Sequence, residues 1–245
     1  MDRLSIRARP DGSPIMHQNW GKLLFLHFSV PVSVLRPMIP KALEIDTHDG
    51  GAWVSITPFT MWGIRPVMLP AVPGLSETHE LNVRTYVHAE GVPGVWFFSL
   101  DASNAIAVLA ARLGFHLPYY RAEMHLEEAA ETFDFVSRRT DGDGARADFH
   151  ARWTRGPEMP APAPDSLEFF LVERYCLYAA REAKVYRARI HHAPWSLRRA
   201  TVEELTSTMG EASGIKLPDK PALVQAQGEP LAVEVWPLKE LGTGL

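Results

Sequence analysis

The sequence predicts an α+β fold that is mainly β, and two observations lead to this fold class. Many short segments are either continuously apolar or alternate between apolar and polar residues, as buried and half-buried strands do. Helical periodicity is confined to a few short stretches, and strands and helices do not follow one another in a βαβ order. This pattern favours an α+β domain or a mainly β barrel.

The length of the chain allows a single domain. A chain of 245 residues can bury a sizeable core without disulfides or metals. We expect residues 1–18, which are polar and contain two prolines, to form a flexible N-terminal arm. Residues 19–245 are expected to form one domain.

Strands are expected wherever a short apolar or alternating run is bounded by turn residues. Lys22–Val30 is too short and too apolar for a surface helix, which predicts a buried strand. Pro31 and Pro40 bracket a short helix. The other expected strands cover residues 52–60, 80–88, 95–100, 120–128, 132–138, 147–154, 185–191 and 232–236, with a tight turn at residues 141–144.

Two helices and one long loop complete the expected organisation. An alanine-rich run predicts a helix that Ser103 or Asn104 caps and Gly114 ends. Ser166 is expected to cap a second short helix. Residues 62–78 hold three prolines and two glycines and are too long for a simple turn, so we expect a lid or a binding loop there.

Composition and charge exclude several classes of function. The formal net charge is −4 and the pI is about 6.2, with no basic run longer than a pair. Neither nucleic acid nor an anionic membrane is therefore an expected partner. The ten histidines are scattered without ligand spacing, and no phosphate- or dinucleotide-binding fingerprint is present. We expect no metal and no cofactor.

Cysteine usage and the N-terminus predict a cytoplasmic location. Cys176 is the single cysteine, so no intrachain disulfide can form, and its apolar neighbours predict a buried residue rather than a nucleophile. The N-terminus lacks the apolar core of a signal peptide. No run approaches the ~20 apolar residues that a membrane-spanning helix needs.

The segment of residues 80–88 has a distinct polar face. Its alternation places Glu80 and Arg84 on one side with an asparagine, a tyrosine and a histidine, opposite leucine and valine. Such a face can be solvated for solubility, or it can line a polar cavity. Glu80 and Arg84 lie about 13 Å apart along an extended strand, so they are not a simple ion pair.

Several motifs together carry a resemblance to a known family. They are KLLFLHFSVPVSVLRPMIPKALEID, HELNVRTYV, GVWFFSLDA, FFLVERYCLY and IHHAPWSL. The chain resembles the YqjF-like family of uncharacterised bacterial proteins over about residues 18–240. That family is similar in turn to the acetoacetate decarboxylase-like superfamily. The resemblance implies a distorted cone-shaped β-barrel around an internal pocket, with a few short flanking helices.

The resemblance also assigns residues to the pocket. Glu80 matches the glutamate that positions substrate in the decarboxylases, and Ser55 falls where a second pocket glutamate would be. Lys22 lies near the position of a substrate-binding arginine. Where the decarboxylases carry two lysines after a proline, this chain has Tyr119 and Tyr120. An imine needs an unprotonated amine, which a phenol cannot supply.

The leading hypothesis is that the protein binds or transforms a small carbonyl- or carboxylate-bearing metabolite without a lysine Schiff base. Alternation predicts that Tyr119 and Tyr120 face opposite ways, so only one of them serves the pocket. The expected catalytic residues are Glu80, Tyr119 and Tyr120, and the expected substrate-binding residues are Ser55, Arg84, Arg121 and Lys22.

Two alternatives stay open. A non-catalytic scaffold would have a filled interior, with Trp53, Phe98 and Tyr119 packed across it. A decarboxylase-like lyase would use Lys22 as the amine, because the chain has no lysine between Lys41 and Lys184. The superfamily resemblance is also compatible with a homo-oligomer.

Overall fold

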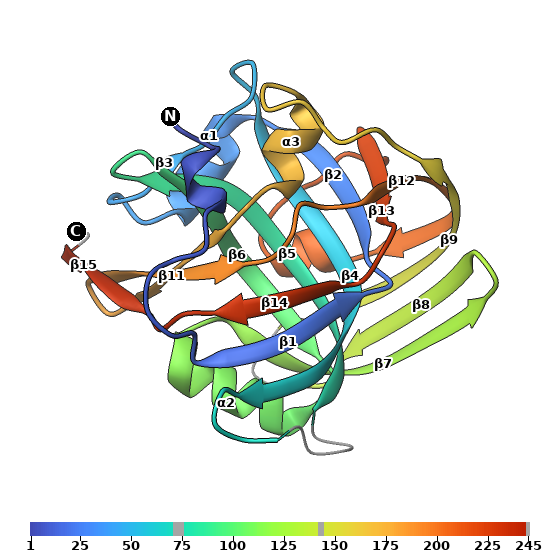
Figure 1. The fold of residues 1–245 in the computed structure, drawn as a ribbon. Helices are drawn as coiled ribbons and strands as arrows, with labels where there is room; N and C mark the ends of the chain where they lie inside the picture. Colours follow the sequence, from blue (N-terminus) through green and yellow to red (C-terminus); the bar gives the residue numbers. More distant parts are fainter. Residues whose placement is uncertain (71–75, 142–144, 244–245) are drawn as a thin grey trace.

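The structure is a computed structural model that describes residues 1–70, 76–141 and 145–243, and its fold is mainly β (Figure 1). The expected turn at residues 141–144 and the expected loop at residues 62–78 fall partly outside the described residues. The strands are β1 (Met16–Gly21), β2 (Leu24–Val30), β3 (Glu44–Ile45), β4 (Ala52–Pro66), β5 (Glu77–Ala89), β6 (Val92–Ala102), β7 (Tyr119–Ala129), β8 (Thr132–Arg139), β9 (Asp148–Glu158), β10 (Cys176–Arg181), β11 (Lys184–His191), β12 (Leu197–Ser207), β13 (Leu223–Gln227), β14 (Leu231–Val235) and β15 (Lys239–Thr243).

The strands pair into a closed ring that the central strands β4, β5 and β6 divide in two. On one side, β4 pairs with β1, and β14, β11 and β10 continue the circuit back to β6. On the other side, β4 pairs with β2, and β13, β12, β9, β8 and β7 lead back to β6. The two circuits therefore share one sheet, and each face of that sheet looks into a different interior.

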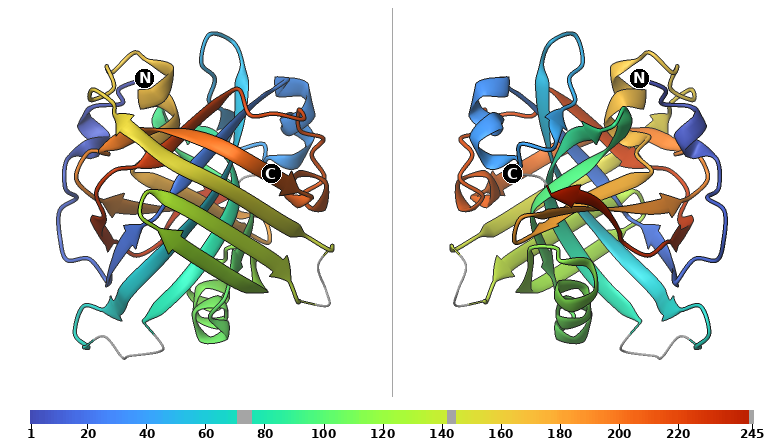
Figure 2. Two further views of the ribbon diagram at one scale, coloured as in Figure 1. Left: turned by 90° about the vertical axis from the view of Figure 1, so that its right-hand side faces the viewer. Right: turned by 90° about the vertical axis from the view of Figure 1, so that its left-hand side faces the viewer.

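One of these interiors is filled. Leu81 and Val83 of β5 face a core in which the rings of Phe133 and Trp153 stack with their centroids 5.2 Å apart. The strands β8, β9 and β12 lie side by side and form the outer wall of this core (Figure 2). Apolar packing therefore holds this half of the ring together. The opposite face of β5 points into the other circuit.

The helices are short and cover the ends of the ring. They are η1 (Ser5–Arg7), α1 (Val32–Leu35), η2 (Arg36–Met38), α2 (Ala105–Phe115), α3 (Leu167–Val172) and α4 (Met209–Ala212). The expected short helix between Pro31 and Pro40 is present as α1 and η2. Ser166 caps α3, its hydroxyl accepting a hydrogen bond from the backbone N–H of Phe169.

Helix α2 departs from the expectation in two ways. Asn104 caps its start as predicted, but the helix runs past Gly114 and ends at Phe115, followed by the capping residue His116 with a left-handed φ of 54°. The helix joins β6 to β7, and these two strands pair in parallel. The expected absence of a βαβ order is therefore wrong at this point. The crossover carries the chain directly from β6 to Tyr119.

The N-terminal residues contact the ring through arginines. Arg3 donates two hydrogen bonds, of 2.6 and 2.7 Å, to the buried carboxylate of Asp46. Arg189 donates to the carbonyl oxygens of Ile6 and Ala8. Strand β1 already begins at Met16, inside the range expected for the arm.

In the described part of the chain, none of the helices combines the length and the apolar character that crossing a lipid bilayer requires.

Candidate functional site

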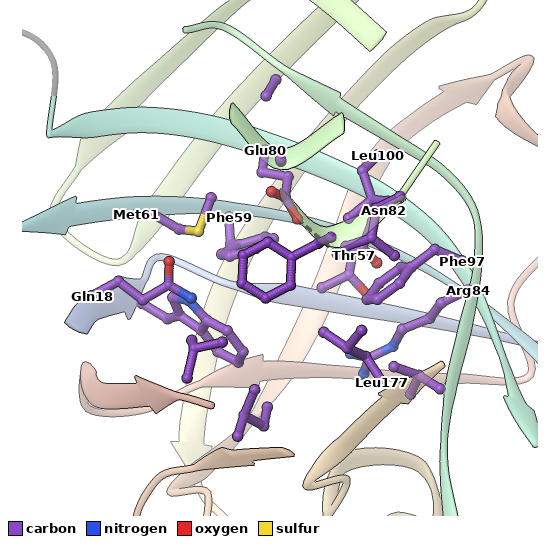
Figure 3. A pocket seen from close by; sticks show the side chains of 18 of the residues that line it. Gln18, Thr57, Phe59, Met61, Glu80, Asn82, Arg84, Phe97, Leu100 and Leu177 are labelled. Carbon is purple, nitrogen blue, oxygen red and sulfur yellow. Dashed lines mark hydrogen bonds between the residues drawn. The ribbon is translucent and has the colours of Figure 1, made fainter. Parts of the chain in front are cut away.

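The circuit that β1, β14, β11 and β10 form with the central sheet encloses a cavity of about 210 Å³. Its walls come from β1, β4, β5, β6, β10, β11 and β14, and α2 covers one end (Figure 1). Most lining side chains are apolar or aromatic. Most of the polar exceptions lie on the central sheet, where Glu80, Asn82 and Arg84 point into the cavity beside Thr57 (Figure 3).

The polar row follows from the alternation of β5. Glu80, Asn82 and Arg84 occupy successive positions on one face of this strand, and all three line the cavity. The sequence predicted this face, and of its two interpretations the cavity lining is the one observed. Thr57 of β4 lies directly opposite Asn82 and adds a hydroxyl to the same wall.

A β-bulge shapes the neighbouring strand. The pairing of β6 with β5 shifts by one residue between Val83 and Arg84, which leaves Phe98 as the extra residue. Strict alternation would place Phe97 and Leu100 on opposite faces, whereas the bulge lets both line the cavity. Phe98 instead packs against the apolar core on the other face.

The centre of the candidate site is the pair of Glu80 and Tyr119. The Tyr119 hydroxyl donates a hydrogen bond of 2.7 Å to Oε2 of Glu80, and the Asn82 amide lies 3.4 Å from Oε1. Burial raises the pKa of Glu80 to about 7, against the opposing effect of these two hydrogen bonds. Burial and the Glu80 charge raise the pKa of Tyr119 well above its ordinary value. Tyr119 is therefore a neutral donor, and Glu80 can exchange a proton near neutral pH.

Arg84 is a cation with no carboxylate partner in residues 1–70, 76–141 and 145–243. Its Nε and Nη2 atoms are buried and have no hydrogen-bond partner among the described residues. The guanidinium stands over the ring of Phe25, 5.6 Å from its centroid. Its charge, added to complete burial, lowers the pKa of His27 to about 3, so that histidine is neutral. The side chain as a whole is half-buried, and free guanidinium donors of this kind suit an anionic group.

Tyr120 faces away from the cavity, as alternation predicts for a neighbour of Tyr119. Its ring lies under the guanidinium of Arg139, 3.9 Å from centroid to carbon. Arg139 in turn holds Asp101 through two hydrogen bonds of 2.9 and 2.7 Å, and both side chains are buried. The ring of Tyr120 therefore packs against a buried ion pair, which lies behind the cavity wall.

The other predicted substrate-binding residues lie outside the cavity lining. Ser55 is buried between His27 and Tyr86, with its hydroxyl 2.6 Å from a polar atom of each. Arg121 is exposed. Lys22 is paired with Glu128 at 2.8 Å on the surface. Of the residues predicted for the site, the cavity brings together Glu80, Tyr119 and Arg84.

Sequence reasoning missed several polar lining residues. Arg174 and His192 line the cavity, and each has a buried nitrogen without a hydrogen-bond partner in the described part of the chain. Cys176 lines it too, and burial raises the pKa of its thiol to about 11, which keeps it protonated. Their signal in the sequence is weak, because no motif of defined spacing marks them as lining residues.

The cavity does not offer a metal site in the described residues. No group of three or more histidine, cysteine, aspartate or glutamate side chains converges among them. The donors that line it suit an organic ligand with oxygen atoms instead.

Comparison with known proteins places this geometry in a family. Residues 17–230 match the model of the DUF2071 family, described as an uncharacterized conserved protein. The chain belongs to this family. Uncharacterized protein YqjF of Bacillus subtilis (strain 168) is 43% identical to it over 236 residues, which is 94% of each chain. The resemblance noted in the sequence is confirmed.

Solved structures confirm the fold that this DUF2071 chain was expected to have. The enduracididine biosynthesis enzyme MppR, complexed with a condensation product of pyruvate and imidazole 4-carboxaldehyde, aligns with a TM-score of 0.65. It is 13% identical, over 94% of this chain and 90% of MppR. Acetoacetate decarboxylase of Legionella pneumophila aligns with a TM-score of 0.62 at 12% identity, over 98% and 94% of the two chains. At this identity the likeness concerns the fold alone.

Proposed function

We propose that the protein binds a small organic acid that also carries a carbonyl or hydroxyl oxygen, and that it does so without forming a lysine imine. The carboxylate of the ligand pairs with Arg84. Its second oxygen accepts a hydrogen bond from the protonated carboxyl of Glu80, or from the Tyr119 hydroxyl when that hydroxyl donates to the ligand in place of Glu80. The observation that carries this proposal is the Glu80–Tyr119 hydrogen bond, which lies in the same cavity as a guanidinium that has no carboxylate partner among the described residues.

The chemistry of the three side chains supports this ligand class. A guanidinium with free donors binds carboxylates in preference to neutral groups. A carboxyl group with a pKa of about 7 is partly protonated at neutral pH and can donate to an oxygen or accept a proton from it. In a reaction at a carbonyl, Glu80 would move the proton and Tyr119 would stabilise negative charge on the oxygen. The fold is shared with MppR, whose solved complexes contain pyruvate.

The position of the Lys22 amine supports the part of the proposal that excludes a lysine imine. Lys22 is partly exposed and engaged by Glu128, and it is absent from the cavity lining. The filled scaffold gains no support in this circuit, because Tyr119 lines a cavity there and Trp53 and Phe98 do not. Both a cytoplasmic location and a homo-oligomer remain part of this proposal.

A ligand screen tests the proposal. Thermal-shift measurements with a panel of 2-oxo, 3-oxo and hydroxy acids should give hits whose stabilisation is lost in Arg84→Met and weakened in Glu80→Gln and Tyr119→Phe. Matched controls are Arg121→Met and Tyr120→Phe, which should respond as the parent does. If hits stabilise Arg84→Met and Glu80→Gln as well as the parent, the site is elsewhere.

A second measurement addresses the amine. Borohydride added with any carbonyl hit should leave the mass of the protein unchanged. A covalent adduct that Lys22→Met removes would instead support the lyase alternative.

A further inference from the structure

The cavity has two kinds of wall, and the contrast between them narrows the ligand class. Most of the polar side chains lie on the central sheet, along β5 and the adjoining part of β4, and Gln18, Arg174 and His192 are exceptions elsewhere in the lining. The strands that complete the circuit, β1, β10, β11 and β14, supply mainly apolar and aromatic side chains. They include Met16, Trp20, Leu177, Ile190 and Val235, and Trp195 lies beside them. A ligand that met only the polar row would leave this apolar surface without a partner.

The size of the cavity points the same way. A cavity of about 150 Å³ with apolar walls accommodates benzene. The cavity here measures about 210 Å³, which leaves room for a carboxylate and one further oxygen beside a six-membered ring.

Helix α2 limits this space through small side chains. Ala107, Ala111 and Phe115 lie four residues apart on one face of the helix, and all three line the cavity. The methyl groups of the two alanines leave volume that any longer side chain would occupy. Ile106 and Leu109, on the outer side of the same helix, are both 59% exposed.

We infer that the ligand is an oxo or hydroxy acid with an aromatic or branched apolar body, and that Ala107 and Ala111 set how large this body can be. This inference rests on the proposed function, since the carboxylate and the oxygen are held by Arg84, Glu80 and Tyr119. The apolar body lies against Phe97, Leu177 and Trp195, and its far end reaches α2.

The test compares two acids that differ only in a phenyl group. Binding of 2-oxobutanoate and of 2-oxo-4-phenylbutanoate is measured by calorimetry on the intact chain. The phenyl acid should bind at least tenfold more tightly. Ala111→Leu should weaken the phenyl acid at least tenfold and leave the smaller acid within twofold. The matched control is Ala105→Leu, the same change at an exposed position of α2, which should alter neither affinity.

Other outcomes overturn the inference. It is wrong if 2-oxobutanoate binds as tightly as the phenyl acid, or if Ala111→Leu weakens both acids equally. A second variant, Ala107→Val, repeats the measurement with a smaller addition in case Ala111→Leu does not fold. If other acids bind in an Arg84-dependent manner while the phenyl acid does not, this inference fails and the proposed function stands. If no acid depends on Arg84, both fail.

Discussion

The hydroxyl of Tyr119 in β7 lies 2.7 Å from Oε2 of Glu80 in β5, although β6 separates the two strands in the sheet. The parallel pairing of β6 with β7 places Tyr119 beside Leu100, and β6 in turn places Leu100 beside Asn82. Every second residue of these strands faces the cavity, so the crossover through α2 brings a phenol to the carboxyl group. The donor is thus positioned by backbone register.

The raised pKa of Glu80 makes stability depend on pH. Its pKa is about 7 in the folded protein and 4.5 in an ordinary exposed setting. Between these values the folded state holds a proton that the unfolded state has lost. The stabilisation is fully present below pH 4.5 and is lost as the pH rises through 7, at a cost on the order of 3 kcal/mol.

Glu80→Gln removes this titration. We expect the free energy of unfolding of the variant, relative to the parent, to rise as the pH increases from 5 to 8. Urea unfolding at several pH values measures the difference. A difference that stays constant over this range would show that Glu80 does not titrate as its burial implies.

Tyr119→Phe deletes the donor and leaves the buried carboxylate less well solvated. We expect the free energy of unfolding to fall by about 2 kcal/mol at pH 8, where Glu80 is ionised, because hydrogen bonds to charged groups are stronger than those between neutral groups. At pH 5, where Glu80 is protonated, the loss should be about 1 kcal/mol. Tyr120→Phe is the control, since its ring contact with Arg139 survives the change. Equal losses at both pH values would contradict the charged hydrogen bond.

Part of this site could be predicted from the sequence, because it depends on local alternation. The polar face of β5 is visible in the chain itself, and so is the opposite orientation of Tyr119 and Tyr120. The family resemblance added the expectation that Glu80 faces a pocket. These predictions concern residues whose direction follows from strand periodicity alone.

The remainder depends on contacts between distant strands. Nothing local reports that β6 bulges at Phe98, or that β4 pairs with β2 over its first part and β1 over its last. Because of that divided pairing, one half of the ring is filled and the other is hollow. Ser55 shows the consequence, since it lies on a strand that lines the cavity, yet it bonds to His27 and Tyr86 beyond the lining.

Because Arg139 forms a buried ion pair with Asp101, we expect its replacement to destabilise the protein much more than replacement of the adjacent Arg138. Arg139→Met would leave the Asp101 carboxylate buried without its partner, which costs about 3–5 kcal/mol. Arg138 is exposed and pairs with exposed Glu123, so Arg138→Met should cost less than about 1 kcal/mol. Urea unfolding of the two variants measures the contrast. Similar losses in both would mean that Arg139 is solvated.

Arg84 and Arg174 line the same cavity, and replacing each with methionine should change the stability of the protein in opposite directions. Arg174 donates to Asp46 at 2.6 Å and to the carbonyl of Phe170 at 2.7 Å, so Arg174→Met breaks a buried network at a cost of about 3–5 kcal/mol. Arg84 has no carboxylate partner among the described residues, and two of its nitrogens are buried without hydrogen bonds.

Arg84→Met therefore replaces an uncompensated charge with an apolar side chain against Phe25. The lost cation–π contact is worth about 0.5–1 kcal/mol, which is less than the cost of about 1–3 kcal/mol that each buried donor without a hydrogen bond carries. We expect the variant without ligand to be more stable than the parent by about 1 kcal/mol. Proteins retain such costs at functional sites, so a gain in stability together with lost ligand binding would mark Arg84 as a binding residue. If Arg84→Met is destabilised as strongly as Arg174→Met, the guanidinium is a structural element of the cavity wall.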